Sequence, residues 1–154
     1  MRIKIMEKND IADVQLLFAE LQNLHAKNEP EIFVKDVVRS AEYYLDILNR
    51  NDRVIWVAVE NSKVVGCIKG KIIDFDGKDI LKKRKYGFID GMIVDKSNRG
   101  KLVEYKLQNA LFSWFKEQGI THIEASVWNF NENAKKYYEA FGYKYTKLGL
   151  CIDI

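Results

Sequence analysis

Hydrophobic residues recur along the chain in two rhythms, and each rhythm predicts one type of element. Near the start, over residues 2–7, apolar and charged residues alternate, which predicts a short strand. From Asn9 to about residue 28, apolar residues return at three- and four-residue steps, which predicts a helix capped by Asn9 or Asp10. The same spacing predicts a second helix over about 34–50.

The rest of the chain predicts strands first and then an alternation of strands and helices. Stretches rich in β-branched and aromatic residues predict strands at 53–60, 64–75 and 86–94. They are followed by a helix over about 100–118, a strand at 122–128, a helix at 131–141 and a final strand at 143–154. A helix as long as the one after the third strand can return the chain for parallel pairing, and such strands can splay at their carboxyl ends.

These elements predict an α/β (α+β) fold: a mixed, mostly antiparallel sheet with one parallel, splayed strand-helix-strand unit and helices on both faces. With 154 residues, 47% of them hydrophobic, the chain is expected to form a single domain over residues 1–154. This composition excludes the disordered and collagen-like classes. No apolar run approaches the ~20 residues of a membrane span, and the first residues are too charged for a secretory signal, so we expect a soluble, cytoplasmic protein.

Charge and cysteine content narrow the function classes. The net charge is only +3, and the one basic run, residues 78–85, predicts a solvated loop, with a phosphate or polyanion contact as the alternative. This run has no aromatic residue for base stacking, so nucleic acid is not an expected partner. Cys67 and Cys151 are far apart and are expected to be buried free thiols, and His25 and His122 are isolated, so no metal site is expected.

Two segments carry candidate chemistry. In the first, VDKSNRGK at residues 94–101, a strand passes through a basic turn into a helix, and a helix start with Arg99 and Lys101 suits a phosphate. An ordinary basic turn is the alternative. In the second, residues 128–143, Asn131, Ala134, Tyr138, Gly142 and Tyr143 keep a fixed spacing. Helix caps and core tyrosines are the alternative interpretation.

Together the two segments resemble the GCN5-related N-acetyltransferase (GNAT) superfamily. The first looks like the pyrophosphate loop of the family, and the second matches its Asn-x-x-Ala-x-x-x-Tyr-x-x-x-Gly-aromatic signature at every position. The resemblance implies an enzyme that uses acetyl-coenzyme A (acetyl-CoA) as a co-substrate, without a metal. It implies a cofactor site formed by Met92, Ile93, Val94, Arg99, Gly100, Lys101, Leu102, Val103, Glu104, Asn131 and Tyr138.

The reaction that the resemblance implies is acetyl transfer to a primary amine of a small, polyamine-like or protein acceptor, by direct attack in a ternary complex. An amine with a pKa near ~10.4 must first lose a proton, and Asp90 is the candidate base, with a structural hydrogen-bonding role as the alternative. Backbone N–H groups of residues 92–94 would stabilise charge on the thioester oxygen, and Tyr138 would protonate the leaving thiolate. The acceptor pocket is expected at the loop 25–33, where Glu29 and Glu31, with Asp90, would attract a cation.

Two residues depart from the family loop, which is usually Arg/Gln-x-x-Gly-x-Gly/Ala. Leu102 and Glu104 stand at its two small positions, and the Glu104 carboxylate would repel a pyrophosphate. The alternative function is therefore a non-catalytic member of the same fold that binds an acyl-CoA or another protein. A homodimer that pairs through the edge strand 143–154 is a further possibility.

Overall fold

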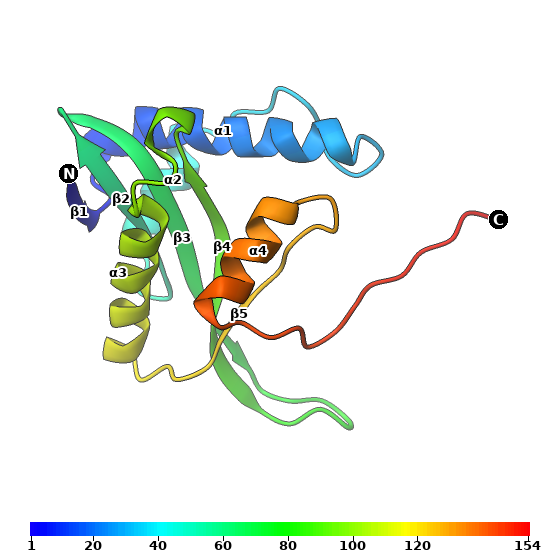
Figure 1. The fold of residues 1–154 in the computed structure, drawn as a ribbon. Helices are drawn as coiled ribbons and strands as arrows, with labels where there is room; N and C mark the ends of the chain where they lie inside the picture. Colours follow the sequence, from blue (N-terminus) through cyan, green and yellow to red (C-terminus); the bar gives the residue numbers. More distant parts are fainter.

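Five strands form one sheet in the order β1-β2-β3-β4-β5, as the computed structural model of residues 1–154 shows (Figure 1). The strands are Arg2–Ile5 (β1), Arg53–Glu60 (β2), Lys63–Phe75 (β3), Arg84–Val94 (β4) and Ile123–Ala125 (β5). The first four strands are antiparallel neighbours, whereas β4 and β5 are parallel. The predicted mixed, mostly antiparallel sheet with one parallel pair is confirmed.

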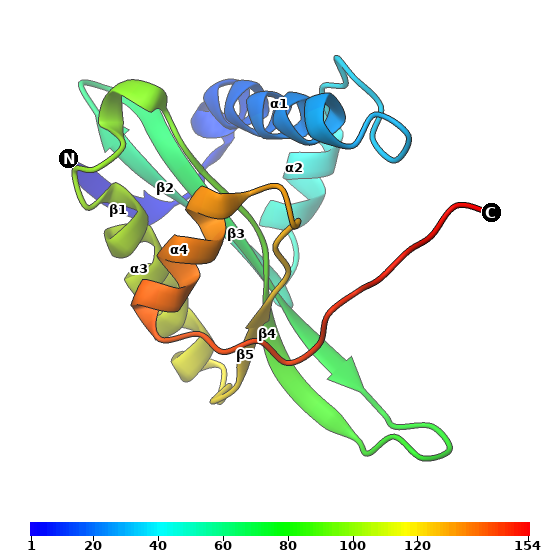
Figure 2. The ribbon, with the colours of Figure 1, turned by 45° about the vertical axis from the view of Figure 1, so that its right-hand side comes forward.

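Four helices surround this sheet. They are Ile11–Asn28 (α1), Ala41–Leu48 (α2), Val103–Glu117 (α3) and Glu132–Phe141 (α4), with short 3-10 helices at Lys8–Asp10 (η1) and Lys96–Asn98 (η2). Helices α1 and α2 cover one face, and α3 covers the other with α4 beside it (Figures 1 and 2). The prediction of helices on both faces is confirmed.

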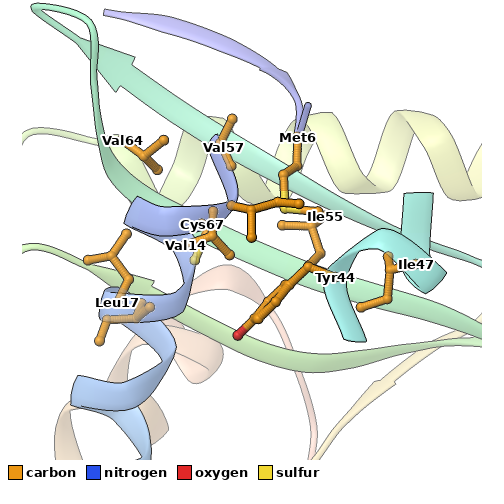
Figure 3. Close-up of a cluster of buried hydrophobic side chains, with 11 residues drawn as sticks. Met6, Val14, Leu17, Tyr44, Ile47, Ile55, Val57, Val64 and Cys67 are labelled. Atoms are coloured by element: carbon orange, nitrogen blue, oxygen red, sulfur yellow. The ribbon is translucent and has the colours of Figure 1, made fainter. Parts of the chain in front are cut away.

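Each face of the sheet has its own hydrophobic core. On the α1 and α2 side, Val14 and Tyr44 pack on Ile55 and Cys67 of the sheet, and none of the four is more than 1% exposed (Figure 3). Burial of apolar surface is the main driving force for this packing. The predicted burial of the Cys67 thiol is confirmed.

The second core requires an unusually close approach of α3 to the sheet. A Cβ atom on Gly70 would lie 2.5 Å from Cδ1 of Leu111, and one on Gly87 would lie 2.7 Å from Cε1 of Phe115. Both distances are shorter than real Cβ contacts. Glycine at these two positions therefore lets the fully buried Leu111 and Phe115 seat against β3 and β4.

The β3–β4 hairpin reaches past the rest of the sheet (Figure 2). Its connection, residues 76–83, is a turn in which the Lys83 ammonium lies 2.8 Å from the Asp76 carboxylate. The basic run is thus an exposed loop, as predicted, although its last two residues, Arg84 and Lys85, belong to β4. None of the helices has the length and hydropathy that crossing a membrane requires.

The predicted second helix is wrong over its first part. Helix α2 begins only at Ala41, where the Ser40 hydroxyl accepts the Tyr43 N–H at 3.4 Å. Asp36 has a φ of 58°, which no right-handed helix contains. The valines that suggested helical spacing are poor helix formers, and they lie in a loop. These valines are Val34, Val37 and Val38.

The C-terminal end also differs from the prediction. Residues 143–154 contain neither strand nor helix, and the expected strand at 122–128 is limited to the three residues of β5. Apolar alternation predicts a strand only where a neighbouring strand completes its hydrogen bonds, and the chain supplies none for 143–154. Cys151 is consequently exposed, so its predicted burial is wrong.

Most of the predicted helix ends are confirmed. Asn131 Oδ1 accepts the Ala134 N–H at 3.1 Å and caps α4, and Gly142 ends this helix with a φ of 99°. Gly119 ends α3 with a φ of 73°. The side-chain cap expected for α1 is wrong, because the Asp10 carboxylate accepts the Glu7 N–H at 2.8 Å instead.

Candidate active site

The exposed backbone edge of β4 is the centre of the candidate site. Parallel pairing with β5 stops at Ile89 and Ala125, whereas β4 continues to Val94. Residues 92–94 pair with β3 on one side only. The backbone groups on their other side have no strand partner, so an extended ligand can bind along this edge.

A helix start lies at the end of this edge. The turn after β4 leads through η2 and Arg99 into α3. The Arg99 Nε donates to the Val94 carbonyl at 2.9 Å, and its guanidinium lies 3.5 Å from Glu20. Lys101 Nζ lies 3.2 Å from Asn98 Oδ1 and is otherwise exposed. The first N–H groups of α3 have no intrahelical acceptor. The turn places Arg99 and Lys101 next to them, so the groups expected to bind phosphate lie at one helix start.

The two residues that depart from the family loop occupy the same helix start. Leu102 is the N-cap residue of α3 with a φ of 60°, a left-handed conformation that favours glycine, and its side chain is 66% exposed. It offers no side-chain acceptor to the first N–H groups. Glu104 lies in the first turn, close enough to Tyr137 to contribute to raising the pKa of that phenol. The backbone N–H groups and the basic side chains at this helix start therefore suit a pyrophosphate. The Glu104 carboxylate would repel it.

Tyr138 differs from the tyrosines on either side of it. Buried Gln108 holds both neighbours, since it accepts from the Tyr137 hydroxyl at 2.9 Å and donates to the Tyr143 hydroxyl at 3.3 Å. The Tyr138 ring packs edge-on against both rings, while its hydroxyl is left without a protein partner. Burial raises the pKa of Tyr138 to about 12. At neutral pH it is thus a protonated donor with a free hydroxyl.

Asp90 sits on a bulge and is held by two lysines. Lys69 pairs with Gly91 and Gly70 pairs with Ile89, so Asp90 is the extra residue on β4. Its carboxylate lies 2.9 Å from Lys69 Nζ and 3.4 Å from Lys71 Nζ.

This ion pair decides the proton affinity of Asp90. Burial alone would raise the pKa of Asp90, but the attraction and hydrogen bonds of Lys69 and Lys71 outweigh burial and hold the pKa below its ordinary value. Such a carboxylate is a weak base toward an alkylammonium group.

A cavity of about 510 Å³ opens on the α1 side of this bulge. We call it the acceptor pocket, for the role that we propose for it below. Its walls come from α1, from the loop after α1, from β3 and β4, and from Trp128 after β5, and they are predominantly apolar. Asp90 and Lys69 lie in its wall. The pocket therefore adjoins the exposed edge of β4, two residues before Met92.

The loop that the sequence suggested does line this pocket, but through side chains other than the two expected glutamates. His25, Ile32 and Phe33 line the acceptor pocket, whereas Glu29 and Glu31 are not among its lining residues. Glu31 is exposed to solvent. The loop follows the end of α1, and its apolar residues turn inward, since burial favours them over carboxylates.

His25 is a candidate that sequence reasoning set aside because it is isolated along the chain. Its ring stacks on Phe33 with centroids 5.0 Å apart and meets the edge of Phe130 at 5.9 Å. Burial lowers the pKa of His25 below its ordinary value, so the imidazole is neutral at neutral pH. Only the packed fold brings His25 into the wall of this pocket, and no local motif signals that position.

Comparison with known proteins identifies the family. The model of the acetyltransferase (GNAT) family matches residues 18–143, which include β4, the helix start of α3 and the whole of α4. No curated protein matches the chain significantly.

Solved structures share the fold at low sequence identity. A variant of the BH1408 protein from Bacillus halodurans that carries four substitutions is 21% identical to this chain. The match covers 100% of both chains, with a TM-score of 0.91. The aminoglycoside 6'-N-acetyltransferase AAC(6')-Ig from Acinetobacter haemolyticus is 15% identical over 100% of this chain and 98% of its own, with a TM-score of 0.74. AAC(6')-Iy in complex with CoA is 17% identical over 99% and 98%, with a TM-score of 0.76. With the family match over most of its length, the chain belongs to the acetyltransferase (GNAT) family.

Proposed function

We propose that the protein is an N-acetyltransferase that moves the acetyl group of acetyl-CoA to a primary amine by direct attack while both substrates are bound. One observation carries this proposal: the exposed edge of β4 beyond Ile89 runs from the acceptor pocket at Asp90 to the helix start of α3. An amine in the pocket and an acyl chain along the edge would meet at this strand. The solved neighbours that acetylate aminoglycosides support transfer to amines in general.

Acetyl-CoA would supply the activated acetyl group. The chain has groups that would bind its pyrophosphate and its extended arm. The first N–H groups of α3, with Arg99 and Lys101, would hold the pyrophosphate. The free backbone groups of residues 92–94 would bind the extended arm and stabilise negative charge on the thioester oxygen. Asn131 uses its side-chain oxygen to cap α4, so its amide N–H₂ would be the part that binds cofactor.

The acceptor ammonium must lose a proton before it attacks. The ion pair with Lys69 makes Asp90 a poor direct base, and we assign to it the orientation of Lys69 and of the incoming amine. Neutral His25, in the wall of the same pocket, is the better proton acceptor, directly or through water. The nearby cation Lys69 also favours the neutral form of the acceptor.

The leaving thiolate then takes a proton. Tyr138 is suited to donate it, because its hydroxyl is protonated and has no protein partner. Neither cysteine is placed for a covalent intermediate: Cys67 is fully buried in the first core, and Cys151 lies in the C-terminal segment. This supports direct attack.

The rival function is a non-catalytic member of the family that binds an acyl-CoA or another protein. It is favoured by the Glu104 carboxylate and by the strained Leu102 at the helix start, where a pyrophosphate would bind. Only the acetyltransferase would turn acetyl-CoA over. If the protein does not bind acetyl-CoA at all, the non-catalytic function with a protein partner is favoured.

Calorimetry and a thiol-release assay separate these functions. We expect heat on adding acetyl-CoA, and release of free thiol that requires an added amine. Glu104→Gln should tighten cofactor binding about tenfold, since it removes a like charge beside the pyrophosphate. Binding without thiol release for any amine would leave the acyl-CoA-binding function, and no binding at all would leave the protein-binding one.

A further inference from the structure

The acceptor pocket carries more positive than negative charge. Two cations, Lys69 and Arg39, lie in its wall, and Asp90 is the one acid there. Asp90 is already shared between Lys69 and Lys71. His25 adds no charge at neutral pH, because burial lowers its pKa. The acids that would attract a polycation are therefore missing from this site.

The remaining wall is aromatic and aliphatic. Phe33 meets Trp128 edge-to-face with centroids 5.0 Å apart and stacks on His25. Phe18 and Tyr44 lie deeper, with their rings stacked at 6.4 Å. Lys69 Nζ lies 5.4 Å from the Phe18 ring, so even its charge is covered by aromatic surface. Such a wall favours an apolar body on the acceptor.

Building on the proposed acetyl transfer, we propose that the acceptor is a primary monoamine carried on an aromatic or branched apolar body, and not a polycation. The single amine loses its charge when it reacts, and the positive wall favours that loss. A second ammonium group would stay charged beside Lys69 or Arg39 without a free carboxylate to pair with. The substrate class therefore differs from that named for the aminoglycoside-acetylating neighbours.

Two amines of equal length test this inference. Hexylamine and 1,5-diaminopentane differ mainly by one terminal charge, and thiol release from acetyl-CoA measures kcat/KM for each. We expect hexylamine to be used at least about tenfold better, and phenethylamine better still. Equal or better use of the diamine would overturn the inference. A protein that released no thiol with any of the three would contradict the proposed function instead.

A charge reversal links the preference to the pocket. Arg39→Glu adds an acid to the wall at an exposed position, so it should lower the hexylamine preference about tenfold. Lys35→Glu is the matched control, since Lys35 lies in the same loop, is exposed and does not line the pocket. An equal effect of both substitutions would show that net charge, and not the wall, sets the preference.

Discussion

Lys69 and Asp90 form an ion pair, Nζ to Oδ2 2.9 Å, across the bulge at which β3 and β4 change register. Lys69 is only 9% exposed and also donates to the Tyr43 hydroxyl at 2.9 Å. The pair links the charge of the acceptor pocket to the backbone of the strand that carries the exposed edge. Its disruption should therefore affect both stability and catalysis.

Asp90→Asn should destabilise the protein. The substitution leaves the Lys69 ammonium buried without its carboxylate, and for a partly buried pair we expect a loss of about 1–3 kcal/mol in the free energy of unfolding at pH 7. Denaturant unfolding measures this loss. The double variant Asp90→Asn, Lys69→Met should recover part of it, and a double variant less stable than the single one would contradict the explanation.

The Asp90 contribution should depend on pH in a fixed direction. Because the pKa of Asp90 is lower in the folded protein than its ordinary 3.8, the unfolded chain binds the proton more tightly. The difference in unfolding free energy between the wild type and Asp90→Asn should be complete above about pH 4 and shrink as the pH falls through the folded pKa. A constant difference down to acid denaturation would contradict this.

Tyr138→Phe should reduce turnover far more than binding. Loss of general acid catalysis lowers kcat by about 10²-fold, while the dissociation constant for acetyl-CoA should stay nearly unchanged. Steady-state rates and calorimetry measure the two effects. Tyr137→Phe is the control, since it removes a hydrogen bond to Gln108 and should lower stability with little effect on kcat. Turnover equal to that of the wild type would remove Tyr138 from the acid role.

His25→Gln should change the pH profile of catalysis. The pKa of His25 lies below its ordinary 6.5, so kcat/KM of the wild type should fall only as the pH drops below about 6.5 and the imidazole gains its proton. The variant should be slower at neutral pH and lack this acidic limb. His122→Gln is the control, because His122 lies outside the pocket beside Glu124. If kcat/KM of His25→Gln still falls at acidic pH as in the wild type, the titrating group is not His25.

Leu102→Gly should stabilise the protein. A leucine in the left-handed region destabilises the folded protein by about 1–2 kcal/mol, and glycine removes this strain. Glycine loses more backbone entropy on folding, which offsets about 0.5–1 kcal/mol of that gain. The side chain is mostly exposed, so little burial is lost. We expect a rise in Tm of up to about 2–4 °C by calorimetry. Leu102→Ala keeps the Cβ and the strain, so it should give no such rise, and equal Tm values for both variants would contradict the explanation.

Local patterns were sufficient for much of this fold. The signature from Asn131 to Tyr143 encodes a cap, a helix and a glycine end, all of which depend on residues near one another in the chain, and all three are present. Local patterns failed where distant partners decide. The valines before Ala41 repeat at helical spacing yet lie in a loop, and residues 143–154 alternate like a strand yet have no strand beside them.

The sequence by itself determined the family, the order of most elements and the positions of Arg99 and Tyr138, because these follow from short-range spacing. Tertiary structure decided the chemistry around them. It pairs Asp90 with Lys69, brings isolated His25 against Phe33 in the pocket wall, and leaves Glu29 and Glu31 out of that wall. Charge and proton affinity at a site depend on groups that are distant along the chain and close in space, and only the packed fold brings those groups together.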